Sequence, residues 1–111
     1  MITLFLTLLF GNRTIEIINP PLVWATVTAY SSTISQTDDS PFLTASQKKV
    51  QEGFIACPRR LSFGTIVEIE GKEYVCEDRL ALKFDDRYDI WMPNEQDAKE
   101  FGIKELPVLI K

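Results

Sequence analysis

Asp78 and Asp89 lie eleven residues apart, each within a short segment whose other residues have the apolar pattern of a buried strand. Aspartate is depleted in strands, so two of them in such segments need a reason. Neighbouring carboxyl groups can act as acid and base, because each raises the pKa of the other. Asp89 stands between Tyr88 and Ile90, and an apolar environment raises its pKa further. The pattern indicates a carboxylate site; the alternative is ordinary charge at turns and on the surface.

Composition restricts the chemistry that these residues can join. The chain has 111 residues, 45% of them hydrophobic, which fits one domain with a single modest core. Since it contains no histidine, Ser-His-Asp and Cys-His catalysis and His-containing zinc sites are excluded. A net charge of −4 without a dense basic run makes nucleic acid a poor candidate partner. The spacing C-x18-C is too sparse for a metal site, and we predict no cofactor.

The two cysteines, Cys57 and Cys76, lie in the short apolar runs "IACP" and "YVCE". If these runs are strands that face each other, a disulfide closing a loop of about 20 residues would contribute roughly 3 kcal/mol. The alternative is a pair of buried free thiols, as expected of a cytoplasmic protein. For the disulfide, the two Cα atoms must lie within about 7 Å.

The N-terminal segment "MITLFLTLLF" is apolar, but it is shorter than the about 20 residues that span a bilayer. It lacks a basic n-region, although "VWA" ending at Ala25 resembles a signal-peptidase site. Export signal, membrane-anchor remnant, ordinary edge strand and cloning or gene-model artefact all stay open. We divide the chain into an apolar segment and linker, residues 1–24, and a domain, residues 25–111. Residues 1–20 are expected to pack little against that domain.

The elements that must position Asp78 and Asp89 are short strands separated by turn residues. "ATVTAY", "FLTAS", "GFIAC", "RYDIWM" and "LPVLI" have strand character, and "GTIVEIEGKEYVCEDR" indicates a hairpin that turns at Gly71-Lys72. "NEQDAKEFG" predicts a two-turn helix with Asn94 as N-cap and Gly102 as its end. At least six short strands and one small helix favour a closed all-β barrel.

From Thr28 to the C-terminus, about three quarters of the chain, the sequence resembles the three-aspartate (3D) domain of bacterial cell-wall proteins and membrane-bound lytic transglycosylase A. The resemblance rests on "LSFGTIVEI", on "DRLALKFDDRY" opened by Asp78, and on "DIWMP" begun by Asp89. "TAYSSTISQTDDSPFLTAS" before them and "NEQDAKEFGIKELPVLI" after them also match. Three departures stand out: Cys57 replaces the family's first aspartate before Pro58, Arg79 and Leu80 replace Thr and Gly, and Gln47 replaces a frequent glycine.

This resemblance implies a six-stranded double-psi β-barrel with one short helix and a cleft across one face. It also implies cleavage of peptidoglycan glycan strands by a lytic transglycosylase, acting outside the cytoplasm as a monomer. Such an enzyme uses one aspartate first as the acid and then as the base toward the muramic acid C6 hydroxyl, which gives a 1,6-anhydro product. The resemblance carries over Asp78 and Asp89, and we predict Asp89 as this acid and base with Asp78 as its partner. The alternative is a noncatalytic glycan-binding or wall-remodelling module of expansin-like type, since fold does not fix function. Cys57 in place of an aspartate suggests that a disulfide with Cys76 has taken over a carboxylate's role.

Further residues are candidates for the cleft of such a domain, and each also has an interpretation as an ordinary structural residue. We assign Tyr30, Thr44, Arg87 and Trp91 to substrate binding, although Tyr30, Trp91 and Phe63 are also typical of a small core. Asp85 and Asp86 are interpreted as solvated charge on a loop tip, and so are Asp38 and Asp39, although the resemblance places their loop beside the cleft.

Overall fold

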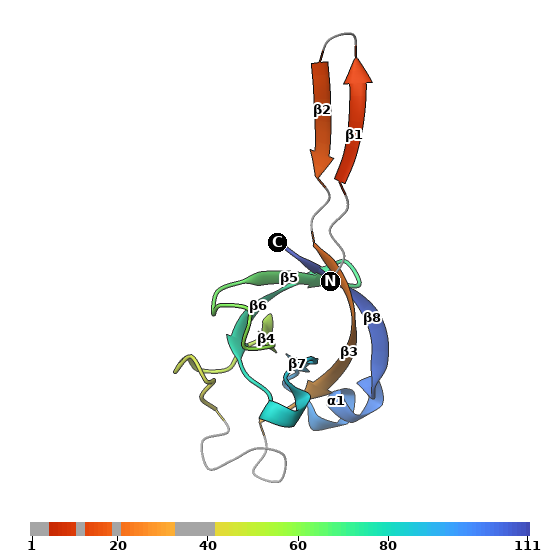
Figure 1. Cartoon of the computed structure of the whole chain (residues 1–111). Helices are drawn as coiled ribbons and strands as arrows, with labels where there is room; N and C mark the ends of the chain where they lie inside the picture. Colours follow the sequence, from red (N-terminus) through yellow and green to blue (C-terminus); the bar gives the residue numbers. More distant parts are fainter. Residues whose placement is uncertain (1–4, 11–12, 19–20, 33–41) are drawn as a thin grey trace.

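A computed structural model describes residues 5–10, 13–18, 21–32 and 42–111, with side chains from residue 21 onward. Six strands close into one barrel in the order β3-β7-β4-β6-β5-β8, which confirms the predicted all-β barrel (Figure 1). The strands are β3 (Leu22–Tyr30), β4 (Phe54–Ala56), β5 (Ile66–Ile69), β6 (Lys72–Asp78), β7 (Tyr88–Trp91) and β8 (Lys104–Ile110). β3 is parallel to β7 and β4 is parallel to β6, whereas the other neighbours are antiparallel, so the barrel is mixed.

The barrel interior is filled by alternate residues of the strands. On β3, Val23, Ala25 and Val27 are buried while the residues between them are more exposed, as the period of two in a strand requires. Aliphatic side chains and Tyr88 from the other strands meet them in one core. Since Tyr88 and Ile90 face this core, the intervening Asp89 belongs to the outer side of β7.

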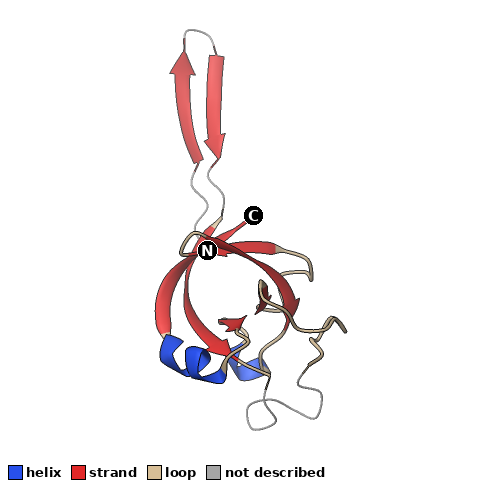
Figure 2. Cartoon of the chain, turned by 180° about the vertical axis from the view of Figure 1, so that it is seen from behind, coloured by secondary structure: helices blue, strands red, loops and turns tan. Residues whose placement is uncertain are grey.

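One short helix, α1 (Glu95–Phe101), packs beside β3 and is visible at the edge of the barrel in Figure 2. The Asn94 side chain accepts hydrogen bonds from the backbone N–H groups of Gln96 and Asp97, and the helix ends at Gly102 with φ 71°. Both predicted helix signals are therefore confirmed. A 3-10 turn, η1 (Leu82–Phe84), lies between β6 and β7.

Two local predictions are wrong. The β5–β6 hairpin turns at Glu70-Gly71, with φ of 52° and 79°, because two consecutive positive φ values give the turn that matches strand twist. Lys72 then opens β6. The segment "FLTAS" forms turns with one isolated bridge, Leu43 to Lys49, instead of a strand. The Thr44 hydroxyl accepts from the backbone N–H of Lys48, and such a local hydrogen bond competes with strand pairing.

At the N-terminus, β1 (Phe5–Phe10) pairs with β2 (Arg13–Ile18) as a separate antiparallel hairpin. Figure 1 shows this hairpin extending away from the barrel. β3 already begins at Leu22, and Ala25 pairs with Leu106 of β8 inside the barrel. Cleavage after Ala25, at the "VWA" site, would remove the first four residues of β3, and the export signal stays a prediction. Among the described residues, no helix has the length and apolar character needed to cross a membrane.

Candidate functional site

Strand register brings the two predicted catalytic aspartates together. β4 lies between β6 and β7, and its residue Ala56 pairs with Asp78 on one side and with Asp89 on the other. Because neighbouring strands lie about 4.8 Å apart, the Cα atoms of the two aspartates are roughly 10 Å apart. Ala56 itself is only 2% exposed, so other groups, among them Tyr30 with its hydroxyl on Asp78, pack on this side of the barrel.

A β-bulge in β6 sets this register. Val75 pairs with Phe54 and Cys76 with Ile55, but the next β4 residue, Ala56, pairs with Asp78, so Glu77 is the extra residue. A regular ladder would place Glu77 opposite Ala56 and turn Asp78 to the other side of the strand. Bulges commonly redirect a side chain beside a functional site.

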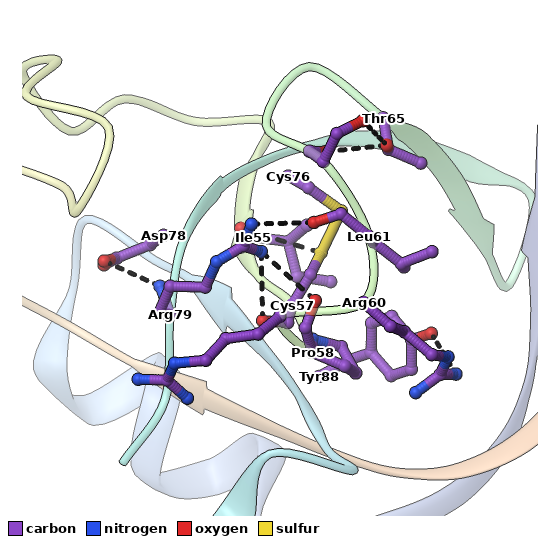
Figure 3. Close-up of a disulfide and its surroundings, with 12 residues drawn as sticks. Ile55, Cys57, Pro58, Arg60, Leu61, Thr65, Cys76, Asp78, Arg79 and Tyr88 are labelled. Carbon is purple, nitrogen blue, oxygen red and sulfur yellow. Dashed lines mark hydrogen bonds between the residues drawn. A yellow bond between two sulfur atoms is a disulfide. The ribbon is translucent and has the colours of Figure 1, made fainter. Parts of the chain in front are cut away.

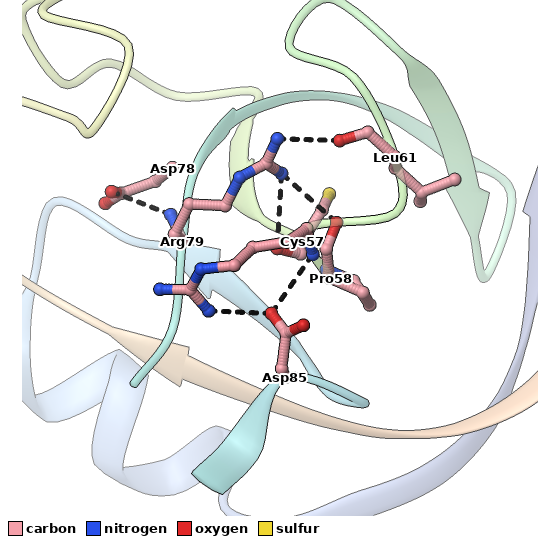
Figure 4. A network of polar contacts seen from close by, with 7 residues as sticks. Cys57, Pro58, Leu61, Asp78, Arg79 and Asp85 are labelled. Atoms are coloured by element: carbon pink, nitrogen blue, oxygen red, sulfur yellow. Dashed lines mark hydrogen bonds and ion pairs between the residues drawn. The ribbon is translucent and has the colours of Figure 1, made fainter. Parts of the chain in front are cut away.

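Asp78 accepts three hydrogen bonds. The Tyr30 hydroxyl donates to Oδ2 at 2.6 Å, and the backbone N–H groups of Ala45 and Arg79 donate to Oδ1, each at 2.9 Å. Figure 4 shows the Asp78 carboxyl directed away from the guanidinium of its neighbour Arg79. Three donors suit an ionised carboxylate, which can only accept hydrogen bonds.

Asp89 is in a different environment. It is partly buried, and the Thr28 hydroxyl donates to its Oδ1 at 2.7 Å. Burial, and to a lesser extent the charge of Asp78, raises the pKa of Asp89 from 3.8 to about 6, although the Thr28 hydrogen bond acts in the opposite direction. A carboxyl group that is still protonated near pH 6 can serve as a general acid.

Tyr30 and Trp91 extend the same face. Thr28 pairs with Asp89 and Tyr30 pairs with Trp91 in the parallel β3–β7 ladder, so their side chains lie side by side outside the barrel. Burial, followed by the charge of Asp78, raises the pKa of Tyr30, which keeps its hydroxyl proton available for donation. We call the set Thr28, Tyr30, Asp78, Asp89 and Trp91 the carboxylate face.

Thr44 and Arg87, also predicted as substrate-binding residues, have contacts within the protein. Thr44 is buried, and its hydroxyl bonds with the Ser46 hydroxyl at 2.9 Å and accepts from the Lys48 backbone N–H at 3.2 Å. It therefore shapes the turn that presents the Ala45 N–H to Asp78. Arg87 lies over the ring of Phe84 in η1, 4.5 Å from its centroid. Binding of a glycan by Arg87 stays a prediction.

Cys57 and Cys76 form a disulfide with a Cα–Cα distance of 5.6 Å, which confirms the prediction (Figure 3). Beside it, the Arg79 guanidinium donates to the carbonyls of Cys57, Pro58 and Leu61 at 3.3, 3.2 and 2.7 Å. The same group stacks on Phe63, 4.1 Å from the ring centroid. A buried disulfide is typical of proteins that fold in an oxidising compartment outside the cytoplasm.

The interpretation of Asp85 as solvated charge is wrong. Its Oδ1 accepts from the backbone N–H of Arg59 at 3.0 Å and from the Arg59 guanidinium at 2.8 Å (Figure 4). Asp86 is exposed, as expected. Asp38 and Asp39 lie outside the described residues.

Sequence reasoning missed two contributors, Thr28 and the turn that carries Ala45. Thr28 precedes Tyr30 by two residues in "TVTAY", and this period of two was the available signal that they share a face. Nothing local in the sequence indicates that Ala45 lies against Asp78. In the described part of the chain, no group of three or more acidic or cysteine side chains is arranged to hold a metal ion. No family model and no curated protein matches the sequence.

Proposed function

We propose that this domain cleaves the glycan strands of peptidoglycan by lytic transglycosylase chemistry, in cell-wall turnover outside the cytoplasm. One observation carries the proposal: Asp78 and Asp89 flank Ala56 on one outer face, and the pKa of Asp89 is raised to about 6. A carboxylate that is partly desolvated at the expense of stability is typical of a functional site.

The barrel topology supports assignment to the three-aspartate, double-psi class. Two parallel pairs, β3 with β7 and β4 with β6, lie within an otherwise antiparallel closed barrel of six strands. The segment between Asp78 and Asp89 forms a loop with one 3-10 turn, and α1 and β8 follow in the order that the resemblance implies.

The proposed mechanism assigns each polar group a role. Protonated Asp89 donates its proton to the glycosidic oxygen, and the bond from that oxygen to C1 of muramic acid breaks. The Asp89 carboxylate then accepts the proton of the C6 hydroxyl while the C6 oxygen bonds to C1, which gives a 1,6-anhydro end without water. Burial is the main cause of the raised pKa of Asp89; Asp78, held by Tyr30, adds to it and stabilises the positive charge that develops at C1. Thr28 orients the Asp89 carboxyl.

The direct test is digestion of purified peptidoglycan by the purified protein, with mass analysis of the released fragments. We expect turbidity clearing below about pH 6 and fragments with anhydromuramic ends, because Asp89 must be protonated. Fragments with ordinary reducing ends would show hydrolysis instead. Absence of any released fragment from pH 4 to 8 would reject catalysis.

A second candidate is a noncatalytic glycan-binding module of expansin-like type. Cys57 favours it, because this position carries the family's first aspartate and is here part of a buried disulfide. Retention of the protein on peptidoglycan without cleavage would select this alternative.

A further inference from the structure

A cleft of about 480 Å³ opens at the end of the barrel where β4 begins. Its walls come from the turn before β4, the first residues of β6 and the last residues of β7. The residues lining it are Glu52, Gly53, Lys72, Glu73, Tyr74, Ile90, Trp91, Met92 and Pro93. Apolar and aromatic groups thus form much of the lining, and charged groups are added by the first two elements.

Trp91 joins this cleft to the carboxylate face. It lines the cleft, and it also follows Asp89 on the outer side of β7. Asp89 and Trp91 are two residues apart on β7, which corresponds to roughly 7 Å along the strand. A chain of sugars with one glycosidic linkage at Asp89 would therefore extend across the indole into the cleft. The Trp91 Nε1–H group donates to the Ser32 hydroxyl at 2.7 Å, which fixes the ring. An immobilised aromatic ring offers a flat apolar surface at little entropic cost.

The charges of the cleft indicate which sugar fits. Glu73 forms an ion pair with Lys111 at 3.4 Å, whereas Lys72 is exposed at the cleft wall. The Lys72 ammonium can therefore pair with a carboxylate of a ligand, and the Glu52 carboxylate can accept hydrogen bonds from sugar hydroxyls. Among the units of a peptidoglycan strand, muramic acid carries such a carboxylate on its lactyl ether wherever the stem peptide has been removed; where the peptide is present, an amide bond takes up this carboxyl group.

We infer that this cleft binds a pyranose with an acidic substituent, of the muramic acid class, with Trp91 against the ring and Lys72 at the carboxylate. The inference rests on the glycan ligand proposed above, and it applies to the catalytic and the binding alternative alike. It adds a binding subsite, next to the carboxylate face, that selects acidic over neutral amino-sugar chains.

The protein has two tryptophans, so Trp24→Phe leaves Trp91 as the only indole reporter. Trp24 is exposed on β3 and does not line the cleft, which makes it safe to replace. We would titrate this variant with peptide-free peptidoglycan oligosaccharides and with chitotetraose, at about pH 8, where Asp89 is ionised and cleavage is suppressed. Both ligands should change Trp91 emission to saturation, and the acidic one should bind more tightly.

Lys72→Ala in this background should weaken binding of the acidic oligosaccharide about tenfold and leave chitotetraose unchanged, as loss of one charged contact predicts. Lys104→Ala, an exposed lysine on β8, is the matched control and should change neither. Equal effects of Lys72→Ala on both ligands, or silent Trp91 emission, would overturn the cleft assignment. If the cleft assignment fails but wild type still cleaves peptidoglycan or sediments with it, the proposed function stands. If wild type does neither, the cleft assignment and the proposed function both fail.

Discussion

The carboxylate face meets the disulfide region, by which we mean Cys57, Cys76, Arg79 and Phe63, at the consecutive residues Asp78 and Arg79. The polar groups of these two regions are arranged differently. Arg79 donates to three carbonyls and stacks on Phe63, next to a buried disulfide. In the carboxylate face, burial raises the pKa of Asp89 on β7. The carboxyl group of Asp78 lies two strands away, on β6. The first arrangement has its charge satisfied and holds a loop in place. The second keeps a carboxyl group where its ionisation is costly, which is why we assign the chemistry there.

Replacing Asp89 with Asn tests the carboxylate face most strongly. Asn keeps the size of the side chain and an acceptor for the Thr28 hydroxyl but has no proton of suitable acidity. We expect peptidoglycan cleavage to fall at least about 100-fold, as for loss of a general acid, while sedimentation with peptidoglycan is retained. Asp86→Asn, on the exposed loop, is the matched control and should clear turbidity at the wild-type rate. Full clearing by the Asp89 variant would end its catalytic assignment.

Removing the disulfide tests the other region. The double variant Cys57→Ala and Cys76→Ala should lower the free energy of unfolding by about 3 kcal/mol, because the loop it closes is 19 residues long. Urea denaturation monitored by circular dichroism measures this. The pH at which cleavage is half-maximal should not move, because the disulfide carries no charge. A shift in that pH would mean that the disulfide also holds the carboxylate face in place.

Asp89→Asn should also increase stability, in contrast to most substitutions. The folded pKa of about 6 exceeds the unfolded value of 3.8, so the folded state binds the proton more tightly. This contribution is fully present below about pH 4 and is lost as the pH rises through 6. The free energy of unfolding of the variant minus that of wild type should be about 2–3 kcal/mol larger at pH 7 than at pH 4. An equal difference at both pH values would show that Asp89 has no raised pKa.

Asp78→Asn should have a smaller effect on rate and should shift its pH dependence. The negative charge of Asp78 raises the pKa of Asp89, so its removal lowers the pH at which cleavage is half-maximal. Because burial is the larger cause, we expect a shift of less than about one pH unit. A pH–rate profile measured on peptidoglycan from pH 4 to 8 checks this, and an upward shift would contradict it.

The barrel and its helix were predictable because their signals are local. Alternation in "ATVTAY" and the Asn94 cap require only neighbouring residues, and the structure contains both elements. The bulge at Glu77 was not predictable, because one extra residue in β6 is defined only by its pairing with β4. That bulge decides whether Asp78 and Asp89 share a face, so the sequence could suggest the pair without placing it. The roles of Ala45 and Arg79 likewise depend on contacts between distant segments.

The smallest expected effects distinguish the two loop aspartates, Asp85 and Asp86. Asp85 accepts from the backbone and the guanidinium of Arg59, and its side chain is 33% exposed, so solvent weakens the ion pair. Asp85→Ala should therefore cost about 1 kcal/mol of unfolding free energy, mostly through the lost backbone hydrogen bond. Asp86→Ala should change it by less than about 0.5 kcal/mol, as for other surface positions. Paired urea denaturation curves measure both, and equal costs would show that the Arg59 contact contributes nothing. A loss of several kcal/mol at Asp85 would instead place this loop with the disulfide region as part of the rigid support of the carboxylate face.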